Sequence, residues 1–274
     1  MSYFYNGKNY KVADSHAHIY PEKIAEKATG SVGDFYDIKM QNPAGTVENL
    51  LKSGAGAGVD KYLVCSVATK PEQVMSISSF IAQECGEHEE FVGLGAFHQD
   101  VTDAEETVLR IKELGLRGVK IHPDFQRVNI NDERLLALYG ILEKEKMPIL
   151  IHMGDDRYDF SSPERLSKVL DKYPDLICIA AHFGGYRAWD KAERFLPAGN
   201  NLWFDTSSSL PFIGKERALE LVGHYGTERM MFGVDFPMWD HKAEIERFLS
   251  LDLSDDDNKK ILFDNFARLF SLSE

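Results

Sequence analysis

The 274-residue sequence lacks features that define several classes of protein. No apolar run approaches the roughly 18 residues that a membrane-spanning helix needs, and residues 1–11 contain no apolar segment like that of a signal peptide. Cysteine is scarce: there are three, without the spacing of a metal or redox motif, and Cys65 and Cys178 lie inside apolar runs. These absences predict a cytoplasmic protein with reduced thiols.

Positive charge is also in short supply. The 31 lysines and arginines are outnumbered by 44 aspartates and glutamates, which gives a net charge of -13. This balance argues against a nucleic acid or an anionic membrane as partner. The chain is long enough to bury a large core, and its composition (43% hydrophobic, 27% charged) is ordinary for a globular protein. The expected partner is therefore a small-molecule substrate.

Apolar segments that resemble strands alternate with amphipathic helical segments along the whole chain. Eight strands are predicted, near residue 12 and at 61–68, 91–97, 118–122, 148–152, 176–181, 202–206 and 230–234. Strict alternation of this kind predicts an α/β protein with the (β/α)8 TIM-barrel fold, as a single domain over residues 1–274. An open, doubly wound sheet is the alternative. It would place a glycine-rich turn after the first strand, where this chain has His16-Ala17-His18.

Two segments outside this alternation carry their own expectations. Residues 21–45 are rich in glycine, aspartate and lysine, and we predict a long loop there. Because this loop leaves the barrel at the end of the first strand, Tyr36 and Phe35 are expected to close over the site as part of a lid. The alternative is that the loop packs against the second subunit of a homodimer. A C-terminal helix is predicted over 257–270.

Histidines, a lysine and an aspartate occupy the predicted C-terminal ends of five strands. They are His16, His18, Lys120, His122, His152, His182 and Asp235. Any one of them could cap a strand or bond to a loop carbonyl. In a closed barrel, however, these strand ends all face one small volume. Imidazole and carboxylate groups are common metal ligands, so the set predicts a metal site with catalytic groups around it.

Local motifs at these positions resemble those of a known family. They are Asp14-Ser-His-Ala-His18, Gly118-Val-Lys-Ile-His-Pro123, Ala181-His-Phe-Gly-Gly185, Phe204-Asp-Thr-Ser207, Gly233-Val-Asp-Phe-Pro237 and Asn265-Phe-Ala-Arg-Leu269. Together they resemble the amidohydrolase superfamily of metal-dependent barrels, in the branch called amidohydrolase-related or amidohydrolase 2. That branch includes hydrolases and aminocarboxymuconate semialdehyde decarboxylase.

The resemblance implies a ligand set and a pair of catalytic residues. His16, His18, His152 and Asp235 would bind one divalent ion, with Zn²⁺ expected and Mn²⁺ or Fe²⁺ as alternatives. His182 and Asp235 would be catalytic, because both lie close to the water that such an ion activates.

Lys120 raises an alternative, since two-metal members of the superfamily carry a carboxylated lysine near this place. In the one-metal arrangement Lys120 and His122 would instead contact the substrate.

Arg157 and Tyr158 follow His152 closely and are, with Tyr36, the further predicted substrate contacts. A guanidinium suits a carboxylate or phosphate, although an ordinary salt bridge is the alternative for Arg157.

The function expected is a metal-dependent hydrolase of a small polar lactone, amide or cyclic ester. A metal-dependent, non-oxidative decarboxylase of a small carboxylic acid is the alternative, less favoured because decarboxylases of this branch tend to be longer. A metal-binding barrel without turnover is disfavoured, since structural zinc sites are normally closed.

Overall fold

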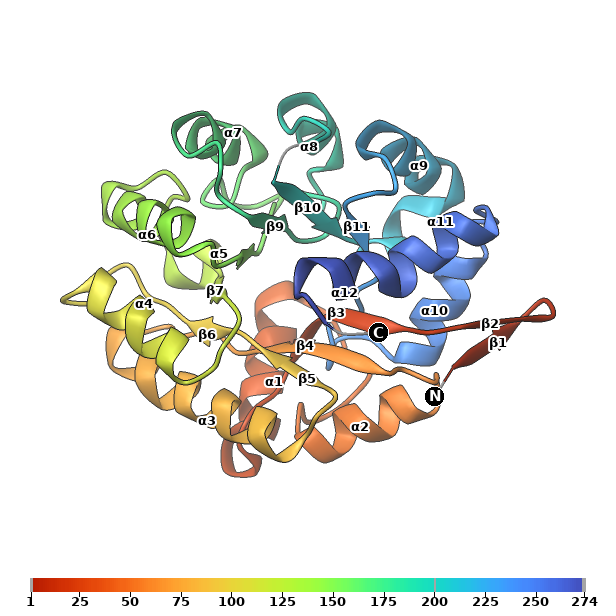
Figure 1. Ribbon diagram of the computed structural model, residues 1–274, viewed down its shortest axis with the longest axis horizontal. Helices are drawn as coiled ribbons and strands as arrows, with labels where there is room; N and C mark the ends of the chain where they lie inside the picture. The colour runs from red at the N-terminus through yellow and green to blue at the C-terminus, as the bar shows by residue number, and fades with distance from the viewer. Residues whose placement is uncertain (1, 200, 273–274) are drawn as a thin grey trace.

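A computed structural model describes residues 2–199 and 201–272. Its central feature is a ring of parallel strands surrounded by helices, which Figure 1 shows in a view down the shortest axis of the molecule. The strands are β3 (Ala13–His18), β4 (Lys61–Cys65), β5 (Phe91–Gly93), β6 (Gly95–Ala96), β7 (Val119–Ile121), β8 (Ile149–Ile151), β9 (Cys178–Ala180), β10 (Leu202–Asp205) and β11 (Met230–Met231). β5 and β6 are separated only by Leu94 and together fill one predicted strand. The nine strands therefore lie at the eight predicted places.

Each strand pairs with the next one along the chain. The order is β3-β4-β5 in one ladder and β6-β7-β8-β9-β10-β11 in the other. The interruption at Leu94 lets one strand bond to β4 on one side and β7 on the other. Backbone bonds then join the last strand region to the first, from Ser15 N to Phe232 O (2.9 Å) and from Asp235 N to His16 O (2.7 Å). The fold is therefore the predicted (β/α)8 TIM barrel.

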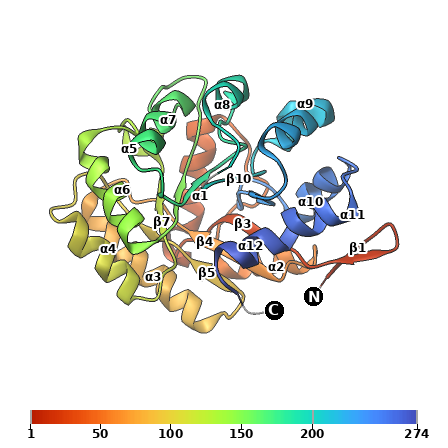
Figure 2. The same cartoon turned by 45° about the horizontal axis from the view of Figure 1, so that its top comes forward.

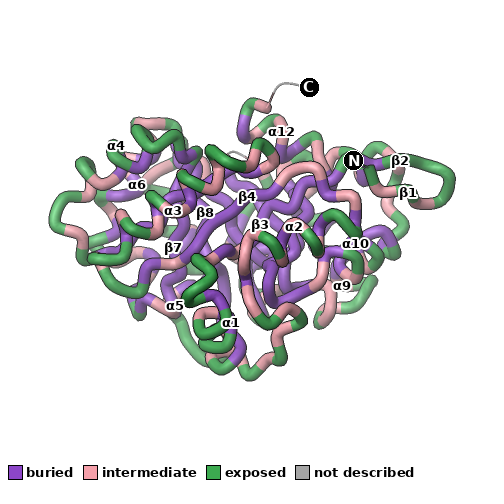
Figure 3. The backbone as a smooth tube through the Cα atoms, turned by 90° about the horizontal axis from the view of Figure 1, so that it is seen from below, coloured by how far each residue is buried: buried purple, intermediate pink, exposed green. Residues whose placement is uncertain are grey.

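Most of the helices cover the outside of this ring, as the tilted view in Figure 2 also shows, and the others lie at its two ends (Figure 3). The helices are α1 (Glu22–Tyr36), α2 (Val47–Ala55), α3 (Val74–Glu87), α4 (Ala104–Glu113), α5 (Pro123–Gln126), α6 (Glu133–Glu145), α7 (Pro163–Lys172), α8 (Trp189–Phe195), α9 (Leu210–Tyr225), α10 (His241–Leu249), α11 (Asp255–Lys259) and α12 (Asn265–Leu269). A 3-10 turn (Pro71–Gln73) precedes α3, and a π-helical turn (Lys260–Asp264) links α11 to α12. An antiparallel hairpin, β1 (Tyr3–Tyr5) and β2 (Lys8–Tyr10), projects from the barrel. No helix in the described part of the chain is long and apolar enough to cross a bilayer.

The barrel interior is closed at one end by the C-terminal helix. Phe266 and Phe270 of this region pack with inward-facing strand residues such as Leu63, Leu150 and Ile179, all buried. Figure 3 shows α12 at one end of the purple, buried strands, and α1 and α5 at the opposite end. The C-terminal ends of the strands therefore open toward α1.

The packing of Phe266 and Phe270 into this end of the barrel, which we call the plug, should be a main source of stability. Phe266 is fully buried, and truncating a buried phenylalanine typically costs about 3–5 kcal/mol. We therefore expect Phe266→Ala to lower the free energy of unfolding by about that amount in urea denaturation. Phe4→Ala is the matched control because Phe4 is 67% exposed on the hairpin, and it should change stability by about 0.5 kcal/mol or less. Equal effects of the two substitutions would contradict this role for the plug.

The prediction of a long loop over 21–45 is wrong for most of that segment, which contains α1. The buried face of α1 is built from Ala25, Thr29 and Gly33, spaced four residues apart. A Cβ on Gly33 would lie 2.8 Å from the carbonyl oxygen of Ile38, so the backbone at Ile38 passes close to α1 at this glycine. Beside these small residues, Ala28, Val32 and Phe35 recur at helical spacing, so the segment carried a helical pattern that the loop prediction overlooked. The helix ends at Tyr36, where Asp37 takes a left-handed conformation.

Candidate metal centre and active site

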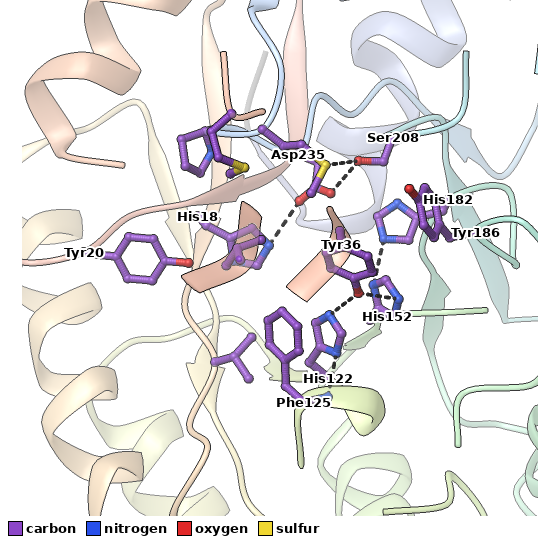
Figure 4. A pocket seen from close by; sticks show the side chains of 15 residues that line it. His18, Tyr20, Tyr36, His122, Phe125, His152, His182, Tyr186, Ser208 and Asp235 are labelled. Carbon is purple, nitrogen blue, oxygen red and sulfur yellow. Dashed lines mark hydrogen bonds and ion pairs between the residues drawn. The ribbon is translucent and has the colours of Figure 1, made fainter. Parts of the chain in front are cut away.

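The predicted strand-end residues converge on one pocket at the α1 end of the barrel (Figure 4). Five of them, His18, His122, His152, His182 and Asp235, line it. They project from the ends of β3, β7, β8 and β9 and from the segment after β11. Rings of Tyr36, Phe125 and Tyr186 supply the apolar walls.

One group of metal-ligating side chains comprises His16, His18 and Asp235. One ligand atom of each lies within 4.8 Å of the others. The Asp235 Oδ1 atom is 3.2 Å from His18 Nε2 and 3.6 Å from His16 Nε2. The other Asp235 oxygen accepts a 2.6 Å hydrogen bond from the Ser208 hydroxyl, which fixes the carboxylate.

The hydrogen bonds of His16 show which of its nitrogens is available to a cation. Its Nδ1 lies 3.0 Å from Asp205 Oδ2. Burial alone would raise the pKa of Asp205, but His16 lowers it to about 2, so this carboxylate accepts the Nδ1 proton. The Nε2 of His16 therefore presents a lone pair toward Asp235. Lys120 Nζ also lies 3.2 Å from this nitrogen and can donate to it. A neutral imidazole beside a carboxylate is nevertheless a donor set that fits a divalent ion.

His152 and His182 form a second pair of facing nitrogens. His182 donates from Nδ1 to the Ser207 carbonyl (3.0 Å), and His152 donates from Nε2 to the Gly154 carbonyl (3.0 Å). The remaining nitrogens, His182 Nε2 and His152 Nδ1, are 3.0 Å apart. Both then carry lone pairs, an arrangement that a shared proton or a metal ion would stabilise. Of the four predicted ligands, three thus cluster closely, while His152 lies beside His182 and belongs to a separate group with His122 and Asp124.

Lys120 is fully buried and does not line the pocket. Its Nζ lies 3.2 Å from His16 Nε2, and burial lowers the pKa of its ammonium group. The structure therefore places Lys120 beside the candidate metal ligands and away from the surface that a substrate would touch.

The remaining predicted substrate contacts divide into two groups. Tyr36 and His122 lie in the pocket, where the Tyr36 hydroxyl is 2.9 Å from His122 Nε2. Arg157 and Tyr158 do not line it. Arg157 makes a salt bridge, which was the alternative to a substrate contact: its Nε lies 3.0 Å and its Nη2 2.8 Å from the two oxygens of Asp155. Tyr158 is 46% exposed.

Sequence reasoning missed residues that hold the ligands in place. Asp205, at the end of β10, orients His16 and also accepts a hydrogen bond from the backbone N–H of His182. Its position at a strand end was a usable signal. Ser207, which contacts His182, is the last residue of the Phe204-Asp-Thr-Ser207 motif, whereas Ser208, which contacts Asp235, lies outside every motif named above.

Asp205 should therefore control metal affinity without binding the metal itself. Groups that orient a ligating histidine commonly contribute about 10–100-fold to affinity. We expect Asp205→Asn to weaken metal binding by about this factor, measured by competition with a chelator. Asp175→Asn, at an exposed position, is the control. Unchanged affinity together with a loss of thermal stability would make Asp205 a purely structural residue.

Comparison with known proteins identifies the family of the chain. The chain matches the family model of the amidohydrolase 2 family, described as Amidohydrolase, over residues 13–272. A search of curated proteins found no significant match.

Solved structures share the fold at low sequence identity. A manganese-bound dihydroxybenzoic acid decarboxylase from Polaromonas sp. JS666 aligns with a TM-score of 0.74 and 16% identity, covering 97% of this chain and 98% of that one. A 5-carboxyvanillate decarboxylase from Sphingomonas paucimobilis gives 0.74 and 13%, covering 96% and 99%. A provisionally assigned 2-pyrone-4,6-dicarboxylic acid hydrolase from Pseudomonas putida gives 0.67 and 17%, covering 96% and 98%. With the family match over nearly its whole length, the chain belongs to the amidohydrolase family.

Proposed function

We propose that the protein is a metal-dependent, non-oxidative decarboxylase of a small aromatic carboxylic acid. The observation that carries this proposal is a pocket lined by aromatic rings and by aliphatic side chains such as Val32 and Met238, together with the candidate metal ligands His18 and Asp235. Apolar walls suit an aromatic ring and remove water from its carboxylate, which favours loss of CO₂. The sequence favoured hydrolysis over decarboxylation, and this proposal reverses that preference. The decarboxylases named above align over 98–99% of their length, so chain length no longer favours hydrolysis.

The ion would be held by His16, His18 and Asp235, with Nδ1 of His152 as the fourth donor. When bound, a divalent cation would supply positive charge for the carboxylate of the substrate. Zn²⁺ and Mn²⁺ both suit a set of imidazoles and one carboxylate, and two of the solved decarboxylases were determined with manganese. We propose one ion per chain, with the two-metal arrangement through Lys120 as the alternative.

The chain's own residues would bind, orient and protonate the substrate. Its ring would lie against Phe125 and Tyr186, and the end of α1 would exclude water. When the bond to the carboxylate carbon breaks, CO₂ leaves and the electron pair stays on the ring carbon, which then needs a proton. His182 Nε2 faces the pocket and is held in place through Nδ1, but it carries a lone pair in the neutral ring. Once this nitrogen has taken up a proton from solvent, it is our candidate for the atom that delivers the proton to the ring carbon.

Hydrolysis of a lactone or cyclic ester remains the second candidate function. The same ligands could hold a metal-activated water, and the Pseudomonas putida neighbour carries a hydrolase assignment.

The two functions predict different products. The protein loaded with Zn²⁺ or Mn²⁺ should be assayed against hydroxybenzoates and against lactones, following CO₂ in the first panel and acid release in the second. For decarboxylation we expect CO₂ and, in D₂O, one deuterium at the vacated ring carbon. Acid release from a lactone with no CO₂ from any carboxylate would replace the proposal by hydrolysis.

A further inference from the structure

The hydroxyl of Tyr36 occupies a polar subsite built from two histidines. Tyr36 is the last residue of α1, and its oxygen lies 2.9 Å from His122 Nε2 and 3.1 Å from His152 Nε2. The two imidazole rings are stacked, with centroids 3.9 Å apart and planes 8° from parallel, so they offer the two Nε2 atoms side by side. Figure 4 shows the Tyr36 hydroxyl pointing at both rings.

The other contacts of these histidines make both Nε2 atoms hydrogen-bond donors. His122 Nδ1 accepts the backbone N–H of Phe125 at 3.3 Å, so the proton of this ring is on Nε2. His152 Nε2 also faces the carbonyl oxygen of Gly154, which can only accept. Because neither Nε2 offers a lone pair, this end of the pocket suits an oxygen atom of a ligand and not a cation.

Asp124 adds an acceptor that nothing in the described chain uses. It is 2% exposed, and neither of its carboxylate oxygens has a hydrogen-bond partner. The Ser161 hydroxyl faces this carboxylate but lies outside hydrogen-bond geometry. Asp124 Oδ2 lies 3.8 Å from His152 Nε2. Since burying an unpaired carboxylate is costly, its place beside two donors indicates a binding role.

The surroundings of the Tyr36 ring suit an aromatic ligand. Phe125 stacks on His122 with ring centroids 3.7 Å apart, and the Tyr36 ring lies 5.9 Å from Phe125 and 5.5 Å from Tyr186. A hydroxylated ring of similar size would meet the same walls and the same two donors.

We propose that His122, His152 and Asp124 form a subsite for an aromatic hydroxyl group, and that Tyr36 fills it as an internal ligand when no substrate is bound. The ligand oxygen takes the place of the Tyr36 oxygen. It accepts a hydrogen bond from His122 Nε2–H and shares His152 Nε2–H with the Gly154 carbonyl, next to the unpartnered Asp124 carboxyl group. The inference rests on the proposed function only in taking the ligand to be part of the substrate.

One side chain that fixes the end of α1 would have to move when a ligand replaces Tyr36. Arg157 donates to the carbonyl of Phe35 and lies over the Phe35 ring, 4.6 Å from its centroid. This contact ties the last turn of α1 to the loop after β8, so substrate entry requires it to shift together with Tyr36.

Tyr36→Ala tests the subsite without any need for turnover. The substitution removes the internal ligand and leaves a cavity of about the size of a phenol ring, so phenol and toluene can be compared by calorimetry on metal-loaded protein. Two hydrogen bonds from the histidines should make phenol bind at least about tenfold more tightly than toluene. Adding His122→Leu to this variant should abolish the preference. Tyr158→Ala, which removes a tyrosine outside the pocket, should bind neither compound more tightly than the unsubstituted protein.

Equal binding of phenol and toluene to Tyr36→Ala would overturn the proposal, because the cavity would then be merely apolar. A preference that survives His122→Leu would also overturn it. If Tyr36→Ala does not fold, Tyr36→Leu keeps more of the apolar packing and still removes the hydroxyl, with the same expected preference. These results are independent of the reaction: intact phenol binding in a protein that releases no CO₂ would contradict the proposed function and leave the subsite standing.

Discussion

A His18→Ala variant is expected to lose its bound metal and nearly all of its turnover. The His18 imidazole lines the pocket, and its Nε2 lies 3.2 Å from the Asp235 oxygen that faces the same volume. Without it, only His16 and Asp235 of the closely spaced group remain. A metal ion that stabilises a transition state by several kcal/mol accounts for roughly a 10³-fold or larger rate effect, since each 1.4 kcal/mol is a factor of ten.

Elemental analysis of protein purified without chelators is the primary measurement, and it requires no knowledge of the substrate. We expect about one divalent ion per chain in the unsubstituted protein and far less in His18→Ala. His224→Ala, which changes an exposed histidine on α9, should retain the ion. Full activity in a protein shown to contain no metal would refute the mechanism proposed above.

The barrel and the convergence of its strand ends could be predicted from the sequence because both follow from local patterns. Apolar strand segments alternate regularly with helices, and the residue after each apolar run is polar where it reaches the mouth of the barrel. Side chains two positions apart on a strand share a face, which is why His16 and His18 both lie at the site. Closure of the ring then brings groups together that are far apart in sequence.

The parts that escaped prediction did so for different reasons. Asp205 contacts His16 across 189 positions of sequence, and its place in the Phe204-Asp-Thr-Ser207 motif did not show which residue it orients. α1 was missed because the glycine, aspartate and lysine content of residues 21–45 outweighed the helical spacing of Ala28, Val32 and Phe35. Arg157 looked like a substrate contact by its position after β8, yet Asp155 sits two residues away and pairs with it.

The distinction between hydrolase and decarboxylase was beyond the sequence for another reason. The two reactions use the same ligand types at the same strand ends, so His16, His18 and Asp235 serve either. Our proposal of decarboxylation depends instead on the pocket wall, to which Tyr36, Phe125 and Tyr186 contribute from different elements. Such a wall is defined only when the chain has folded.

His182→Ala is expected to keep the metal and lose about 10²–10⁴-fold in kcat, the usual contribution of a positioned proton donor. His182 is absent from the group formed by His16, His18 and Asp235, although it forms another candidate group with His16 and Asp205, and its Nε2 lies 3.0 Å from His152 Nδ1. Its Nδ1 is held by Ser207, so the ring is fixed with one nitrogen directed into the pocket. Metal content and kcat measured on the same preparation separate the two roles, and added imidazole should restore part of the activity by occupying the vacated space. Loss of the ion in His182→Ala would instead make His182 a ligand. The facing pair with His152 would then be a second metal-binding position, and the two-metal arrangement with Lys120 would replace the single-ion site.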